Sequence, residues 1–372
     1  MLDDNHVLIC DEHGKVEDIV TLNEAGDGVL KLSGILTPGF INCHCHLELS
    51  HMRGLIPEKT GLIDFVFAVV TQRHFPEEEI VDAIVRAEQE MMANGIVAVG
   101  DICNNLHTLS QKQKNNLHYY NFVEASGWLP GIAEQRFTRS KEYYDALSLT
   151  APTSMVPHAP YSVSDDLWKR ISPHFQNKVA TIHNQETSFE DDLFLNNTGD
   201  FVRMYEMMKI DHSFYKPTGK TSLQSYAGKL SGAAEVLLVH NTFTSEADIT
   251  YAQASLKSAS FCICINANKY IEDRVPPIDL FRKHAGNIVL GTDSLASNRS
   301  LNILDEIKSI QQGFPTIPVD ELLQWATLNG AKALQMDHHL GSFEKDKQPG
   351  VLLITNIDGG KITAQSTVKK LL

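Results

Sequence analysis

Short apolar runs alternate with longer amphipathic stretches along most of this sequence. The runs are rich in β-branched and aromatic residues and are bounded by turn formers, as buried strands are. They predict strands at 35–44, 96–102, 117–125, 153–160, 178–185, 234–241, 259–266 and 287–294. Between most of them the apolar positions recur with the helical period, which predicts helices at 76–95, 164–172, 246–256 and 301–313.

Eight strands alternating with helices over about 300 residues predict an α/β fold, specifically a parallel (β/α)8 barrel of the TIM type. The alternative is an open doubly wound sheet, which usually carries a glycine-rich loop after its first strand. Here the first strand runs into HCHLELSHMRG, which contains neither GxGxxG nor GxxxxGK[ST]. The pattern therefore favours the barrel.

The two ends of the chain differ from its middle. Both consist of short β-like pieces separated by glycines, and the C-terminal one contains the turn Asp358-Gly359-Gly360. We expect 1–36 and 341–372 to pair into one small β subdomain beside a barrel domain at 37–340.

The chain carries 46 acidic and 32 basic residues, a formal charge of −14. This charge argues against nucleic acid or anionic membranes as partners, because both attract basic surfaces. The N-terminus, MLDDNHVLIC, lacks the basic and apolar regions of a secretion signal, and the apolar run at 62–70 is too short to span a bilayer. We therefore expect a cytoplasmic protein with reduced cysteines and a small-molecule substrate.

The ends of the predicted strands carry the candidate chemistry, because catalytic residues of β/α barrels lie at the carboxyl ends of the strands. Five of the eight ends carry residues that bind metals or transfer protons: His44 and His46, His158, His183 and Glu186, His240, and Asp293. A single histidine at a strand end is usually a packed residue. Their coincidence at five ends indicates a functional site, because burying polar groups is costly.

Three imidazoles and one carboxylate form the predicted metal site: His44, His46, His183 and Asp293. This nitrogen and oxygen set suits one divalent ion, with zinc expected and iron as the alternative. A second ion is not expected, because the fourth strand, TSMVPHAP, lacks a lysine that could bridge two metals once carboxylated. Water at an open position of the ion would have its pKa lowered from ~15.7 to about 7.

The alternation in NCHCH separates two kinds of side chain. Successive residues of a strand point to opposite faces, so His44 and His46 share one face and Cys43 and Cys45 share the other. We expect the histidines to face the barrel mouth and the cysteines to pack as small apolar residues.

Five segments resemble the amidohydrolase superfamily, and they follow its order over about 35–340: NCHCHLELSHMRG, VPHAPYSVS, IHNQET, LVHN and GTDSLASNRSLNILDEI. They are similar to its chlorohydrolase and deaminase branch, which includes guanine, adenosine-type and cytosine deaminases. HLELS together with GTDSLASN is most similar to the aminodeoxyfutalosine deaminase-like members. The resemblance implies a metal-dependent hydrolase, and a homodimer stays open because barrels of this superfamily are often dimers.

The resemblance also implies residue roles. Glu186 matches the family's proton shuttle, His240 the histidine that orients the nucleophilic water, and His158 a substrate contact. Asp293 would accept the water's proton as well as bind the metal. The implied reaction is hydrolytic deamination of an aromatic amine, with an aminopurine nucleoside or an aminodeoxyfutalosine-like compound as substrate.

One segment departs from the family pattern. Many relatives have Cys-Pro-x-Ser-Asn after the seventh strand, whereas this chain has Cys264-Ile-Asn-Ala-Asn268. Asn268 therefore remains a predicted substrate contact, and the identity of the substrate stays open. Glu48 and Arg53 follow the first metal strand closely and are also predicted to contact the substrate.

Other functions fit the sequence less well. Hydrolysis of another C–N bond or of a C–Cl bond, as in an amide or a triazine, would use the same metal centre. A non-catalytic barrel would be expected to lack a metal or shuttle residue, and all are present. A serine hydrolase needs a GxSxG elbow and a zinc finger needs CxxC pairs, and the sequence has neither.

Overall fold

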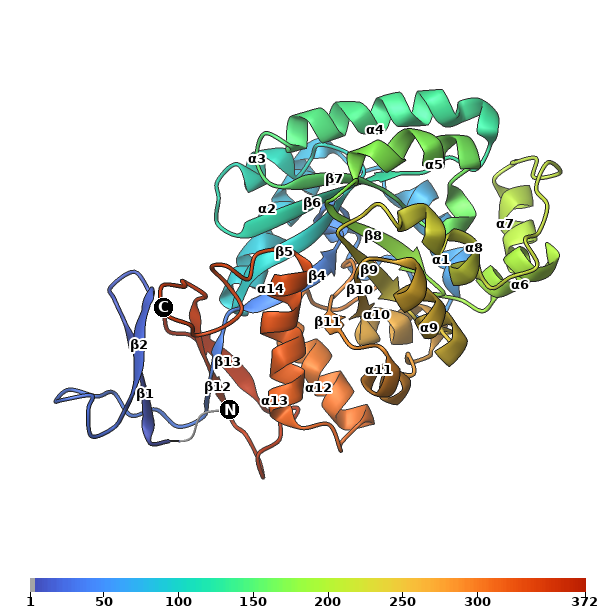
Figure 1. Ribbon diagram of the computed structural model, residues 1–372. Coiled ribbons are helices and arrows are strands. Elements are labelled where there is room, and N and C mark those ends of the chain that lie inside the picture. Colours follow the sequence, from blue (N-terminus) through green and yellow to red (C-terminus); the bar gives the residue numbers. More distant parts are fainter. Residues whose placement is uncertain (1–3) are drawn as a thin grey trace.

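Eight parallel strands form the centre of the molecule (Figure 1). In the computed structural model, which describes residues 4–372, they make two four-stranded sheets, β4-β5-β6-β7 and β8-β9-β10-β11, each in chain order. Their bounds are β4 (Phe40–Cys45), β5 (Ile96–Cys103), β6 (His118–Ala125), β7 (Thr153–Pro157), β8 (Val179–Asn184), β9 (Glu235–His240), β10 (Ala259–Ile263) and β11 (Ile288–Leu290). The predicted parallel α/β arrangement is confirmed.

Hydrogen bonds join the two sheets at both seams. At one seam, the backbone N–H groups of Thr292 and Asp293 donate to the carbonyl of His44, both at 3.0 Å. At the other, the N–H of His183 donates to the carbonyl of His158 at 3.0 Å. These bonds bring residues of four strand ends, far apart in sequence, to the same end of the strands.

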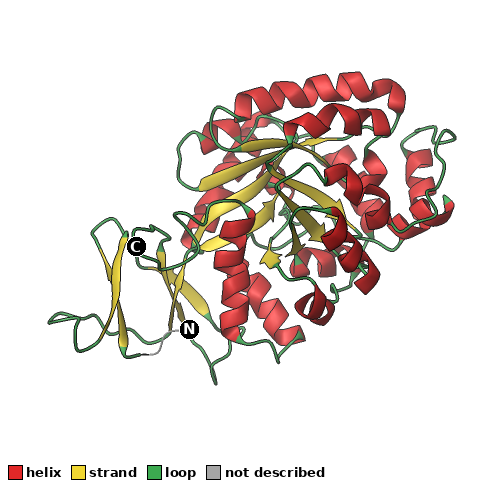
Figure 2. Ribbon diagram, in the orientation of Figure 1, coloured by secondary structure: helices red, strands yellow, loops and turns green. Residues whose placement is uncertain are grey.

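Helices cover the outside of the strands (Figure 2). The predicted helices occur with their ends shifted by at most two residues, as α2 (Glu77–Ala93), α5 (Asp165–Ile171), α9 (Glu246–Ser255) and α12 (Ile303–Gly313). The helices without a prediction are α1 (Leu62–Gln72), α3 (Leu109–Lys112), α4 (Ala133–Leu147), α6 (Phe189–Asn196), α7 (Asp200–Met207), α8 (Ser222–Tyr226), α10 (Ile265–Glu272), α11 (Ile278–His284), α13 (Val319–Gln324) and α14 (Gly330–Ala333). Within residues 4–372, none of the helices has the length and apolarity needed to cross a membrane.

A second cluster of buried apolar side chains is separate from the main core. Its members come from the connections that follow β4, β6, β7, β8, β10 and β11, and include Leu62, Trp128, Tyr161, Phe201, Ile271 and Ala296. Because these connections leave from the carboxyl ends of the strands, the cluster lies at the end of the molecule where the candidate residues gather. Most of its members come from two connections, the one from β4 to β5, which carries α1 and α2, and the one from β8 to β9, which carries α6, α7 and α8.

The chain ends form two small sheets beside the parallel strands (Figure 1). β1 (His6–Cys10) and β2 (Val16–Thr21) make an antiparallel hairpin, and β3 (Ile35–Pro38) joins β12 (Val351–Thr355) and β13 (Thr367–Lys370) in the order β13-β12-β3. The hairpin contacts the C-terminal segment, where the Val16 N–H donates to the Lys347 carbonyl at 2.8 Å and Lys15 pairs with Asp346 at 2.7 Å.

The single strand predicted at 35–44 is two strands in two different sheets. The chain leaves the three-stranded sheet after Pro38 and enters β4 at Phe40. A Cβ atom on Gly39 would lie 2.3 Å from Val97 Cγ1 and 2.7 Å from the Pro349 carbonyl oxygen, so only glycine fits at this crossing. The prediction of one strand was wrong because β character continues through the glycine while the hydrogen-bonding partner changes.

Cys43 and Cys45 are fully buried in the main core, as predicted, and Cys43 packs against Gly330 of α14. Replacing both with alanine should lower the free energy of unfolding by roughly 1 kcal/mol per lost sulfur and leave the metal content unchanged. Urea denaturation and metal analysis of the purified double variant would measure both effects, with Cys10→Ala, outside the core, as the control. Loss of metal from a folded Cys43→Ala, Cys45→Ala protein would contradict this assignment.

Candidate metal and catalytic site

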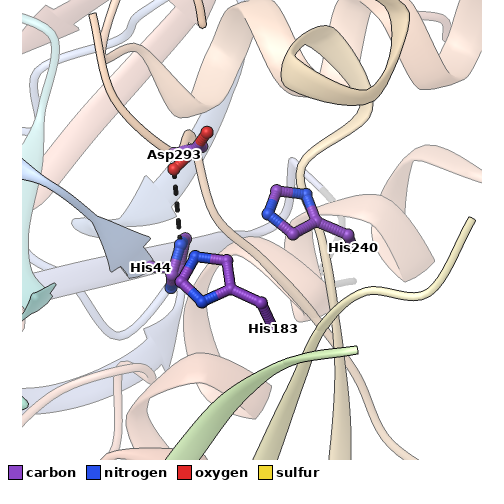
Figure 3. A group of neighbouring side chains, drawn as sticks. All are labelled: His44, His183, His240 and Asp293. Atoms are coloured by element: carbon purple, nitrogen blue, oxygen red, sulfur yellow. Dashed lines mark ion pairs between the residues drawn. The ribbon is translucent and has the colours of Figure 1, made fainter. Parts of the chain in front are cut away.

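Four buried side chains converge at the carboxyl ends of the strands (Figure 3). His44 comes from β4, His183 from β8, His240 from β9, and Asp293 follows β11. Each offers one nitrogen or oxygen atom that lies within 4.8 Å of the others. The rings of His44 and His183 lie next to each other beneath Asp293, and His240 faces them from the side.

The predicted ligand atoms have the spacing that a small divalent ion requires. Asp293 Oδ1 lies 3.4 Å from His44 Nε2 and 3.3 Å from His46 Nε2. His46 Nε2 lies 3.3 Å from His183 Nε2. Ligand atoms of a tetrahedral ion with bonds of ~2.0–2.1 Å are about 3.3 Å apart, so these three contacts have the spacing of ligands around one ion.

His183 and His46 are held in the neutral form, which is the form that binds metals. His183 Nδ1 lies 2.8 Å from the carbonyl oxygen of His158, which can only accept, so Nδ1 carries the proton and Nε2 keeps its lone pair for the cluster. Burial, followed by the neighbouring histidines, lowers the pKa of His183 well below its usual value. Burial lowers the pKa of His46 to about 3, against the opposing charge of Asp293.

Several buried polar atoms of the cluster have no hydrogen-bond partner within the described part of the chain. They are both ring nitrogens of His44 and Nε2 of His240. Buried polar atoms are nearly always partnered in proteins, and a divalent cation is a partner that imidazole nitrogens accept. The residues present therefore fit a metal ion.

Asp293 remains ionised in this site. Its backbone has a positive φ of 57°, and its Oδ2 accepts a hydrogen bond from the Ser297 hydroxyl. Burial alone would raise the pKa of Asp293, but the contact with His44, followed by the neighbouring rings of His46 and His240, holds it well below its usual range. A carboxylate in this state can bind a cation and accept a proton.

Glu186 differs from Asp293, because its surroundings raise the pKa of its carboxyl group instead of lowering it. It is buried two residues after β8, and burial, then the charges of Asp293 and Glu190, raise its pKa well above the usual value. Its Oε1 lies 3.5 Å from Nε2 of His240, whose pKa burial lowers to about 4. The site thus pairs a carboxyl whose pKa is raised with an imidazole whose pKa is lowered, an arrangement that suits proton transfer.

Glu190 holds the turn that presents Glu186. Glu190 Oε1 accepts a hydrogen bond from the Glu186 N–H at 2.9 Å, and its Oε2 accepts from the Gln185 N–H at 3.0 Å and the Ser222 hydroxyl at 2.8 Å. Gln185 has a positive φ of 43°, so this turn needs support. The sequence analysis missed Glu190, although an acidic residue four positions after the shuttle in IHNQETSFE was the available signal.

The other predicted contacts lie in different surroundings. His158 Nδ1 lies 2.9 Å from the Ser162 hydroxyl, and its ring stands 4.8 Å from that of His183. Asn268 is fully buried and donates to the carbonyl of His240 at 3.4 Å, so it supports that residue. The exposed Arg53 pairs with Glu90 of α2.

Glu48 and Glu124 lie beside the cluster and share one partner, Asn104. Glu48 Oε2 accepts from the Asn104 backbone N–H, and Glu124 Oε2 accepts from the Asn104 side-chain amide, both at 2.9 Å. Glu124 Oε1 is 3.4 Å from His183 Nδ1. Burial is the main cause that raises the pKa of Glu48 to about 7 and that of Glu124 to about 8.

Comparison with known proteins agrees with this geometry. Residues 35–368 match the model of the amidohydrolase family. The chain belongs to the amidohydrolase family. A 5-methylthioadenosine/S-adenosylhomocysteine deaminase of Teredinibacter turnerae is 26% identical to it over 337 residues, which are 86% of this chain and 71% of that protein. The predicted resemblance to the deaminase branch is therefore confirmed.

Solved amidohydrolase-like structures share the fold. The aminofutalosine deaminase of Helicobacter pylori, solved with methylthio-coformycin, superposes with a TM-score of 0.79 at 22% identity and covers 95% of this chain and 88% of its own. The zinc-complexed atrazine chlorohydrolase of Arthrobacter aurescens superposes with a TM-score of 0.71 at 16% identity, covering 93% and 81%. The fold of this chain therefore also occurs in a deaminase and in a chlorohydrolase.

Proposed function

We propose that this amidohydrolase is a metal-dependent deaminase that releases ammonia from an aminopurine nucleoside or an aminodeoxyfutalosine-like compound. One observation carries the proposal: the buried Glu186, whose pKa is raised, lies next to a group of histidines and an aspartate that fits a divalent ion. The deaminases among its relatives support the choice of C–N hydrolysis.

One divalent ion would be held by His44, His46, His183 and Asp293. Zinc is the expected metal, because nitrogen-rich sites with one carboxylate suit it and a chlorohydrolase of the same fold was solved with zinc; iron is the alternative. When bound, the ion would supply a hydroxide nucleophile at neutral pH by lowering the pKa of water from ~15.7 to about 7.

The residues of the chain perform the proton transfers in this proposal. Glu186 donates its proton to the ring nitrogen next to the amine-bearing carbon, which makes that carbon a better electrophile. Asp293 accepts the proton that the attacking water loses, and His240 orients the water through a hydrogen bond. Asp293 then passes its proton to the amine, the C–N bond breaks and ammonia leaves, and the proton of the new C–OH group returns to Glu186, so one water is consumed for each ammonia released.

The proposal includes one closed (β/α)8 barrel around this site, with a small β subdomain from 1–36 and 341–372. The hydrogen bonds at both seams between the two sheets support closure. The contacts between the β1–β2 hairpin and the C-terminal segment support a subdomain made from both chain ends, in two sheets. Because the chain changes sheets at Gly39, the N-terminal part of the subdomain would end two or three residues later than residue 36.

An ammonia-release assay with the metal-loaded protein tests the proposed function. The panel would contain adenosine, 5′-methylthioadenosine, aminodeoxyfutalosine, guanine, cytosine and an aminotriazine. We expect ammonia release from at least one of the nucleosides, at a rate well above that of the metal-free protein. Release of chloride from a chlorotriazine without ammonia from any amine would overturn the proposal in favour of the alternative hydrolase.

A further inference from the structure

Two buried carboxyl groups beside the cluster each present one oxygen without a partner. Glu48 and Glu124 are 1% and 4% exposed. In each, Oε2 accepts a hydrogen bond from Asn104, one from its backbone and one from its side chain. In each, Oε1 is buried and has no hydrogen-bond partner among residues 4–372. The shared partner ties the two carboxyls into one unit with two free acceptors.

The nearby donors do not satisfy these acceptors. Glu124 Oε1 lies 3.4 Å from His183 Nδ1, but that nitrogen directs its proton to the carbonyl of His158 at 2.8 Å. Asn104 already gives one N–H to each carboxyl. Because a buried carboxylate oxygen without a donor costs free energy, a ligand with donors is the natural partner.

The position of Glu48 and Glu124 indicates which part of a substrate they would contact. Glu186 and His240, which act on the reacting ring, follow β8 and β9 in one sheet. Glu48, Asn104 and Glu124 come from the ends of β4, β5 and β6 in the other sheet. A substrate with its ring at the first group would direct its substituent towards the second, across the end of the strands.

We propose that Glu48 and Glu124, joined through Asn104, bind two neighbouring hydroxyl groups on the sugar of the substrate. A vicinal diol provides two adjacent hydroxyl groups, which can donate to these two acceptor oxygens. This subsite rests on the proposed function, and it selects ribonucleosides over deoxynucleosides.

Substrate analogues test the subsite without requiring a variant to fold. The wild-type enzyme would be assayed for ammonia release from adenosine, 2′-deoxyadenosine and 3′-deoxyadenosine, and aminodeoxyfutalosine would establish deamination independently. Removing one hydroxyl should lower kcat/KM by about 5- to 150-fold, the usual cost of leaving a buried acceptor without its donor. Ammonia release with equal kcat/KM for adenosine and both deoxy forms would overturn the subsite and leave the deaminase intact. No ammonia from any amine would overturn both.

Variants of Glu48 and Glu124 test whether these two residues cause the preference for adenosine over its deoxy forms. In Glu48→Gln and Glu124→Gln, the preference for adenosine over a deoxy form should fall at least several-fold, while metal content stays at the wild-type value. The control is Glu88→Gln, a buried carboxyl in α2 that is already bonded to Tyr119 at 2.7 Å and Asn116 at 2.9 Å. It should change the kcat/KM of all three nucleosides by one common factor. An unchanged preference in both site variants, or loss of metal in Glu124→Gln, would overturn the assignment.

Discussion

Glu186→Gln should lower kcat for ammonia release by about 10²- to 10⁴-fold, the usual contribution of a general acid. Glutamine has nearly the same shape, and the hydrogen bond that Glu190 accepts from residue 186 comes from the backbone, so the turn should persist. What glutamine cannot do is donate a carboxyl proton, which burial favours on Glu186 by raising its pKa. The loss should therefore appear in kcat more than in binding.

Three measurements on the Glu186→Gln protein separate a chemical effect from a structural one: kcat, metal content and the circular dichroism spectrum. Metal content and spectrum should match wild type, because Glu186 is outside the predicted ligand set. Glu134→Gln, an exposed residue of α4 that pairs with Arg170, is the matched control and should retain wild-type kcat. If the Glu186→Gln enzyme turned over at the wild-type rate, Glu186 would have no part in proton transfer.

His183→Ala should remove the metal and, with it, essentially all activity. Losing a residue that merely orients a ligand already costs 10- to 100-fold in metal affinity, so losing the ligand itself should cost at least about 100-fold. His183 also contacts His46 Nε2 at 3.3 Å, so its loss leaves a gap in the cluster. Metal analysis after dialysis, together with kcat, would measure both effects.

Metal removal from the wild-type protein provides the complementary experiment. Dialysis against a chelator should abolish ammonia release, and adding zinc or iron to the metal-free protein should restore it and reveal which ion the site prefers. His174→Ala is the control for His183→Ala, because its ring packs against Phe137 and Tyr144 outside the cluster. A His183→Ala enzyme that kept its metal would show that a different set of residues holds the ion.

Much of the site could be predicted because its residues lie at strand ends. A strand has a period of two, so His44 and His46 share a face wherever the strand is placed. Parallel strands also bring their carboxyl ends to one side, which makes residues as distant as His183 and Asp293 neighbours in any such fold. The convergence in the structure follows from these two rules.

The residues that the sequence placed less well depend on contacts between distant segments. Arg53 follows the metal strand closely, yet its guanidinium pairs with Glu90 on α2. Asn268 supports the His240 loop from a buried position, and Glu190 holds the turn before Glu186. Each outcome depends on which side chains from other elements are within hydrogen-bond distance, and no local period encodes that.

The amino-acid sequence by itself determined the alternation of strands and helices, the family and the residue types at the strand ends, because these depend on local periodicity and side-chain chemistry. Only the tertiary structure decided that the chain changes sheets at Gly39 and that Asn104 joins Glu48 to Glu124. It also decided which polar atoms of the site lack a partner within residues 4–372. The physical reason is that pairing and burial are properties of several segments together, whereas periodicity belongs to one.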